Sequence, residues 1–144
     1  MHSGCSLQAP SIEQQTQEPE TQPQESVPAD TVPAPSNTAV DSLLQQAQQA
    51  TRQGDHTAAA GLVERALRIT PRNATLWHRL AQIRLAQGQY EQAESTALRS
   101  NAIAPSDKVL QAENWSVIER ARRSRGDAAG AREASQKANL LEEQ

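Results

Sequence analysis

From residue 40 onward, apolar positions recur with the spacing of amphipathic helices, and turn-forming residues interrupt the pattern at regular intervals. Glycine and proline mark these interruptions, because glycine accepts the left-handed conformation that follows a helix end and proline cannot continue a helix. The pattern predicts six helices, over residues 40–53, 57–70, 74–87, 90–104, 107–125 and 128–141. Asn73 is expected to cap the third of these helices and Ser106 the fifth.

The interruptions are periodic. Five pairs of residues are each 34 positions apart, namely Pro71 and Pro105, Gly54 and Gly88, Ile69 and Ile103, Ala59 and Ala93, and Leu43 and Trp77. The spacing then grows to 38 positions, from Trp77 to Trp115 and from Gly88 to Gly126. Four extra residues are close to one turn of an α-helix, so the fifth helix is expected to be about one turn longer.

Small residues must make most of the contacts between these helices, because aromatic residues are only 2% of the chain and phenylalanine is absent. Alanines at repeated positions are expected to let the helices approach closely: Ala47, Ala59, Ala66, Ala81 and Ala93. Larger aliphatic residues are expected to fill the remaining space: Leu62, Leu67, Ile69, Leu76, Leu80, Ile83, Leu98 and Ile103. Trp77 and Trp115 occupy equivalent positions and are expected to be structural.

Residues 1–39 differ sharply in composition from residues 40–144. They hold six of the eight prolines, mixed with Gln, Glu, Ser and Thr. Such a segment has too little apolar surface to offset the entropy of ordering, so we predict a disordered tether followed by one helical domain. Residues 6–39 would span about 30 Å as a flexible coil and about 100 Å in the polyproline conformation.

The distributions of charged and apolar residues argue against nucleic-acid binding and against a membrane-spanning helix. The first 39 residues carry five acidic and no basic residues, whereas the remainder has a net charge of +2. Nucleic-acid binding needs a concentrated basic face, which neither part provides. No run of apolar residues approaches the roughly 20 that a membrane-spanning helix requires.

The segment Ser3–Gly4–Cys5–Ser6 resembles the end of a bacterial lipoprotein signal, in which the cysteine carries the lipid. The apolar stretch that precedes the cysteine in such signals is absent, and His2 stands where they usually have leucine. We infer that the signal has been removed and that Cys5 is lipidated. In the alternative reading, Cys5 is a chance cysteine in a disordered segment and the chain is a cytosolic scaffold.

Residues 40–141 resemble an array of tetratricopeptide repeats, for which a period of 34 residues is typical. The second unit carries the motif most completely, with Trp77, Leu80, Gly88, Tyr90, Ala93, Ala97 and Pro105. Ala81, Arg84 and Ala97 depart from it, since the motif prefers Gly, Tyr and a large residue at these positions. The resemblance implies an all-α fold of about six antiparallel helices in a right-handed superhelix, with repeats at about 40–73, 74–107 and 108–144.

The concave face of such arrays binds a segment of a partner protein. By position within the repeat, the resemblance assigns these residues to that face: Leu44, Gln45, Gln48, His78, Arg79, Gln82, Glu113, Ser116, Arg120 and Arg123. Arrays that bind the C-terminal tails of chaperones need Lys and Asn at positions that here hold Leu44, Gln48, His78 and Gln82, so a chaperone-tail receptor is not expected. Arg120 and Arg123 could meet an acidic partner or be a solvated helix end, and Arg122 is expected to be plain surface.

Taken whole, the chain resembles the small repeat-containing outer-membrane lipoproteins of Gram-negative bacteria, among them the pseudomonad activators of the class A penicillin-binding protein of the 1b type. The resemblance implies a lipid-anchored periplasmic adaptor that docks and activates a peptidoglycan synthase. An assembly factor resembling a pilotin or secretion factor is the alternative. A self-associating repeat is a third class, and the polar last helix favours a monomer instead.

No residue pattern predicts catalysis or a cofactor. The sequence shows no paired acids in a defined site, no nucleophile with a base, and no glycine-rich phosphate loop. His78 has no second ligand at metal-binding spacing, so no metal site is expected. The sequence therefore predicts a non-catalytic protein-binding adaptor.

Overall fold

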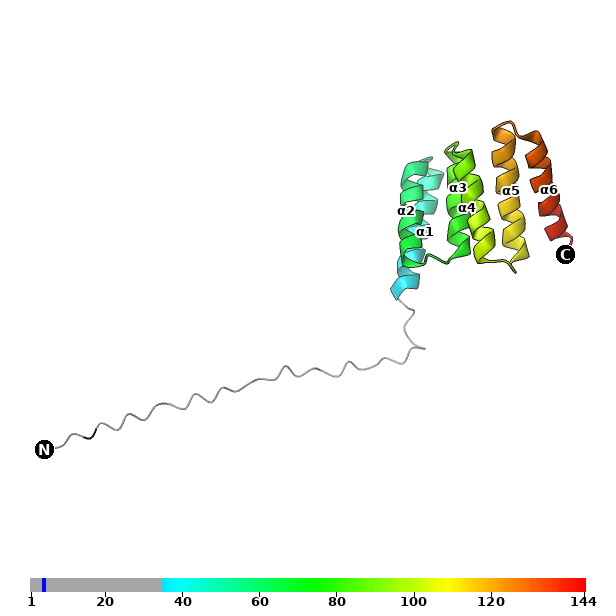
Figure 1. Ribbon diagram of the computed structural model, residues 1–144. Helices are drawn as coiled ribbons and strands as arrows, with labels where there is room; N and C mark the ends of the chain where they lie inside the picture. The colour runs from blue at the N-terminus through cyan, green and yellow to red at the C-terminus, as the bar shows by residue number, and fades with distance from the viewer. Residues whose placement is uncertain (1–3, 5–34) are drawn as a thin grey trace. The chain divides into compact units, whose positions relative to one another are not determined.

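The computed structural model describes Gly4 and residues 35–144. Helices and short turns account for residues 35–144, with no strand among them. The helices are α1 (Pro35–Arg52), α2 (His56–Ile69), α3 (Ala74–Ala86), α4 (Tyr90–Ile103), α5 (Lys108–Ser124) and α6 (Ala128–Glu142). They follow one another side by side as antiparallel pairs (Figure 1). The predicted all-α repeat fold is therefore confirmed, and each predicted helix has a counterpart.

Helix α1 begins at Pro35, five residues before the start predicted at Val40. The missing N–H of proline has no consequence in the first turn of a helix, because amides there have no partner within the helix, and its fixed φ already suits a helix. The prediction that placed Pro35 in the tether is therefore wrong, because Pro35 is the first residue of α1. Cys5 and the rest of the predicted tether before Pro35, apart from Gly4, lie outside the described residues.

Each helix pair is closed by a glycine in the left-handed region. Gly54, Gly88 and Gly126 have φ of 76°, 77° and 86°. At the first turn the Gly54 amide donates to Thr51 and the next amide donates to Ala50, at 3.0 and 2.9 Å. These bonds satisfy the last carbonyls of α1 while the chain reverses. The glycines predicted to end the helices thus do so.

Side-chain caps begin most of the helices. Asn73 accepts a hydrogen bond from the Leu76 amide, as predicted. The cap predicted at Ser106 is wrong, because Asp107 accepts from the Leu110 amide at 3.0 Å and begins α5. A carboxylate also interacts favourably with the positive end of the helix dipole, which a serine cannot do. Helix α5 has 17 residues against 13 in α3, so the predicted extra turn is confirmed.

Small side chains lie at the closest contacts between helices. Seven alanines are completely buried between the helices: Ala59, Ala66, Ala81, Ala93, Ala97, Ala121 and Ala134. One apolar cluster joins α1, α2 and α3, and a second joins the later helices. The expectation that Ile69 and Leu98 fill the core is wrong, since each is 40% exposed. The buried faces of these helices are formed instead by Ala59, Val63, Ala66 and Leu67 in α2 and by Ala93, Thr96, Ala97 and Ser100 in α4.

Trp77 and Trp115 are partly buried and pack against the first and second cluster respectively. The Trp77 indole donates from Nε1 to the Pro71 carbonyl at 2.9 Å. A cation lies over each ring, Arg99 at 4.3 Å from the centroid of Trp77 and Lys137 at 4.4 Å from that of Trp115. This geometry favours cation–π attraction and keeps both rings fixed, so their structural role is confirmed.

A network of charges joins α4 to α5 and corrects the expectation that Arg122 is plain surface. The Arg122 guanidinium donates from Nη2 to Glu94 Oε1 at 2.6 Å, and the two side chains are only 16% and 14% exposed. Arg125 bonds the other oxygen of Glu94 at 2.8 Å. The bond to Glu94 raises the pKa of Arg122, so this residue stays charged. Arg122 lies on the side of α5 that faces α4, where Glu94 meets it.

We predict that Glu94→Gln lowers the free energy of unfolding by about 1–2 kcal/mol, because it removes the nearest counter-charge of a largely enclosed guanidinium and leaves only Glu133, 3.8 Å away. Urea unfolding followed by circular dichroism measures this change. Arg123→Gln is the matched control, because Arg123 is 68% exposed in its pair with Glu119 and should change stability by less than about 0.5 kcal/mol. Equal effects of the two substitutions would contradict the structural importance of the network.

Candidate partner-binding groove

Helices α1, α3 and α5, the first helix of each repeat, line two adjoining hollows, which together we call the groove. Of the residues predicted for this face, all but Gln45 and Arg123 line one hollow or the other: Leu44, Gln48, His78, Arg79, Gln82, Glu113, Ser116 and Arg120. Arg79 and Gln82 line both hollows. The two hollows are therefore continuous across α3.

The first, which we call the apolar hollow, lies between α1 and α3 and has a volume of about 350 Å³. Apolar surface predominates in its lining, and the aliphatic residues that line it are Leu44, Ala47, Val63, Ile83 and Ala86. Its polar lining residues are Gln48, Thr51, Arg52, His56, Arg79 and Gln82. His56 contributes a buried Nδ1 that has no hydrogen-bond partner among the described residues.

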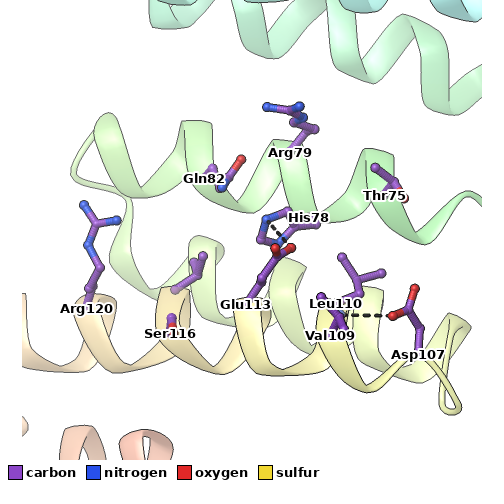
Figure 2. A pocket seen from close by; sticks show the side chains of 11 residues that line it. Thr75, His78, Arg79, Gln82, Asp107, Val109, Leu110, Glu113, Ser116 and Arg120 are labelled. Carbon is purple, nitrogen blue, oxygen red and sulfur yellow. Dashed lines mark hydrogen bonds and ion pairs between the residues drawn. The ribbon is translucent and has the colours of Figure 1, made fainter. Parts of the chain in front are cut away.

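The second, which we call the charged hollow, lies between α3 and α5 and has a volume of about 540 Å³. Figure 2 shows His78 and Glu113 at its middle, with Arg120 at one end and Asp107 at the other. Thr75 and Ser116 add hydroxyl groups to the lining. Charge of opposite sign therefore stands at the two ends of this hollow.

His78 is more deeply placed than its predicted role in the groove implies, since only 7% of it is exposed. Its Nδ1 lies 2.7 Å from Oδ1 of Asn114, which is completely buried. The Asn114 amide donates to Ser100 Oγ at 2.8 Å and to Asn101 at 2.9 Å, so its oxygen faces His78 and accepts. The bond therefore requires a proton on Nδ1 of His78.

The buried polar chain ties three helices together behind the groove. The Ser100 hydroxyl on α4 accepts from Asn114 and donates in turn to the Ala74 carbonyl at the start of α3, at 2.8 Å. His78 Nε2 lies 3.7 Å from Glu113 at the groove surface. His78 thus positions the groove wall and presents one ring edge to an occupant. Sequence reasoning missed Asn114 and Ser100, although both fall on apolar helix stripes where a polar residue needs a buried partner.

Three arginines of the groove make no ion pair with any residue in 35–144: Arg52, Arg79 and Arg120. Arg79 points away from α5, while Arg120 rises beside the C-terminal end of α3 (Figure 2). Arg123 differs, because it pairs with Glu119 on its own helix and lines neither hollow. Exposed arginines without partners can bind carboxylates in bidentate geometry.

The chemical groups that line the groove are suited to binding a protein segment. Within the described range, no group of three or more His, Cys, Asp or Glu residues is placed to hold a metal ion. None of the six helices is both long and apolar enough to cross a bilayer. What the groove offers is apolar surface, hydrogen-bonding groups and unpaired guanidinium groups, which together suit a protein segment.

Comparison with known proteins supports this interpretation. Residues 50–112 match the family model described as tetratricopeptide repeat. The globular C-terminal domain of *P. aeruginosa* LpoP is 46% identical, with a TM-score of 0.68 over 70% of this chain and 95% of that domain. The Sgt2 repeat domain from *Aspergillus fumigatus* is 29% identical, with a TM-score of 0.65 over 77% of this chain and 69% of that one.

A more distant likeness concerns the fold alone. The N-terminal domain of stress-induced protein-1 from *C. elegans* is 17% identical, with a TM-score of 0.64 over 76% of this chain and 99% of that domain. Curated protein sequences gave no significant match. The repeat architecture is thus shared widely, whereas close sequence similarity is found with the *P. aeruginosa* domain.

We predict that Asn114→Ala lowers the free energy of unfolding by about 3 kcal/mol, because it leaves His78 Nδ1 and the Ser100 hydroxyl buried without Asn114 as their partner. Asn101→Ala is the control and should cost less than about 1 kcal/mol, since Asn114 keeps its bond to Ser100. Chemical denaturation measures both. Long-range ¹⁵N correlation spectra of the unchanged chain should show the proton of neutral His78 on Nδ1, and a proton on Nε2 instead would contradict the network.

Proposed function

We propose, because the chain belongs to the tetratricopeptide-repeat family together with the globular domain of LpoP, that it is a non-catalytic adaptor that docks and activates a class A penicillin-binding protein. The observation that carries the proposal is the 46% identity over 95% of that domain. The proposed partner follows from the family resemblance described for the sequence.

The groove supplies a means of activation. An adaptor stimulates an enzyme when it binds the active conformation more tightly than the inactive one, and the population then shifts accordingly. Binding through polar and apolar side chains on three rigid helices suits this role, because the surface needs little ordering when the partner binds. The domain would thus act by contact alone, with the chemistry left to the synthase.

The proposed location is the periplasmic face of the outer membrane, with Cys5 as the lipid-bearing residue. The sequence around Cys5 supports the anchor, and the 29 residues between Cys5 and Pro35 would reach about 90 Å in the polyproline conformation. That length would let a domain held at the outer membrane meet a synthase that is anchored in the inner membrane.

We predict that the chain, expressed behind a lipoprotein signal, sediments with the outer membrane and carries an acyl mass increment on Cys5. Cys5→Ser should release most of it into the soluble periplasmic fraction, because no helix in residues 35–144 can span a membrane. Fractionation with immunoblotting and mass spectrometry of the N-terminal peptide measure the two effects. An unmodified Cys5, or unchanged fractionation of Cys5→Ser, would disprove the anchor.

We predict that the chain stimulates glycan-strand synthesis by a purified class A penicillin-binding protein, and that Arg120→Glu weakens its binding about tenfold. Arg120 lines the charged hollow without an ion-pair partner in the described residues, so charge reversal affects the groove directly. Polymerisation of labelled lipid-linked precursor measures stimulation, and surface plasmon resonance measures affinity.

Arg123→Glu is the matched control on the same helix, because Arg123 lies outside both hollows; a smaller loss is expected for it. A larger loss with Arg123→Glu would move the binding surface away from the groove while keeping the activator function. Binding without stimulation would favour an assembly factor of the pilotin or secretion type. Neither binding nor stimulation would overturn the proposed function.

A further inference from the structure

The two hollows of the groove differ in chemistry, and this difference defines what can occupy them. The apolar hollow has aliphatic residues on three sides, from α1, α2 and α3. Its volume of about 350 Å³ is at the lower end of the range for ligand pockets, which suits an inserted side chain better than a whole domain surface. When a large apolar side chain enters the apolar hollow, its own surface and the aliphatic lining of the hollow are both removed from water.

The charged groups beside the apolar hollow favour an acidic occupant. Arg79 lines both hollows, Arg52 stands at the apolar hollow and Arg120 at the neighbouring one. None of the three makes an ion pair within residues 35–144. The acids of the charged hollow lie toward its middle and far end, and Asp107 is already engaged as the cap of α5. A carboxylate in the charged hollow would therefore bind near Arg120, at the end away from these acids.

The distance between the two subsites follows from helix geometry. The hollows lie on either side of α3, so their centres are separated by about one helix spacing, roughly 8–10 Å. An extended segment advances about 3.3 Å per residue, so roughly three residues separate a side chain in one hollow from a side chain in the other. A segment that crosses the helices can thus reach both.

We propose that the groove recognises an extended partner segment in which a large apolar side chain enters the apolar hollow and a carboxylate about three residues away binds Arg120. The inference rests on the proposed function for the source of the segment, which is the synthase. Its chemistry depends on the groove alone. The apolar side chain contributes burial, and the carboxylate fixes the register of the segment.

Synthetic peptides test the recognition without any synthase. We use twelve-residue Gly/Ser peptides that carry one Leu and one Glu three residues apart, in both orders, with Leu→Ser and Glu→Lys forms as comparisons. The full chain is titrated with each peptide, and amide chemical shifts of the chain measure affinity. We expect the Leu/Glu peptide in one order to bind about fivefold tighter than either comparison, with shifts centred on α1 and α3.

Two variants assign the preference to the two subsites. Ala86→Trp fills the apolar hollow from an exposed position and should remove the preference for Leu; Ala102→Trp, on an exposed position of α4, is its control. Arg120→Glu should remove the preference for Glu over Lys; Arg123→Glu, on the same helix but outside both hollows, is its control. Both controls should bind as the unchanged chain does.

The outcomes separate this inference from the proposed function. Equal binding of all peptides, no binding, or shifts confined to other faces would overturn the inference, even if the chain stimulates the synthase. Selective binding that both groove variants remove would support it, even if no stimulation occurs and the proposed function fails. Loss of selectivity in the control variants as well would also overturn the assignment of the two subsites.

Discussion

The close approach of helices across alanine is the constraint on which the rest of this structure depends. With alanines such as Ala59, Ala93 and Ala97 completely buried, neighbouring helices pack at short distance and no large ring is needed between them. The left-handed glycines that close each pair hold the two helices at that distance. Because each repeat contacts only its neighbours, this local geometry places α1, α3 and α5 along one face. The groove is a consequence of small residues far from its surface.

The periodicity of the chain determines the helices and their order, and this much could be read from spacing alone. The 34-residue spacing between Gly54 and Gly88, and between Pro71 and Pro105, reveals the repeat directly. The four extra residues before Trp115 predict the longer α5. Errors arose where one residue type serves two purposes. Pro35 was assigned to the tether, although proline is equally suited to begin a helix.

The sequence predicted which residues line the groove, but it predicted less well how deeply each side chain is buried. Repeat register placed Leu44, Gln48 and Arg79 on the groove, because a position in the repeat fixes the direction of a side chain. It could not show that His78 is largely enclosed, since that depends on a contact with Asn114, 36 residues away on α5. Tertiary contacts also decide which arginines are paired: Arg122 and Arg123 are adjacent in sequence, yet only Arg122 reaches Glu94 on α4.

The longer fifth helix gives the groove a polarity. At 1.5 Å per residue, the four additional residues make α5 about 6 Å longer than α3, so the two walls of the charged hollow do not match in length. The acid that caps α5 stands at one end of this hollow and Arg120 at the other. A segment laid in the groove and the same segment reversed therefore meet different surroundings.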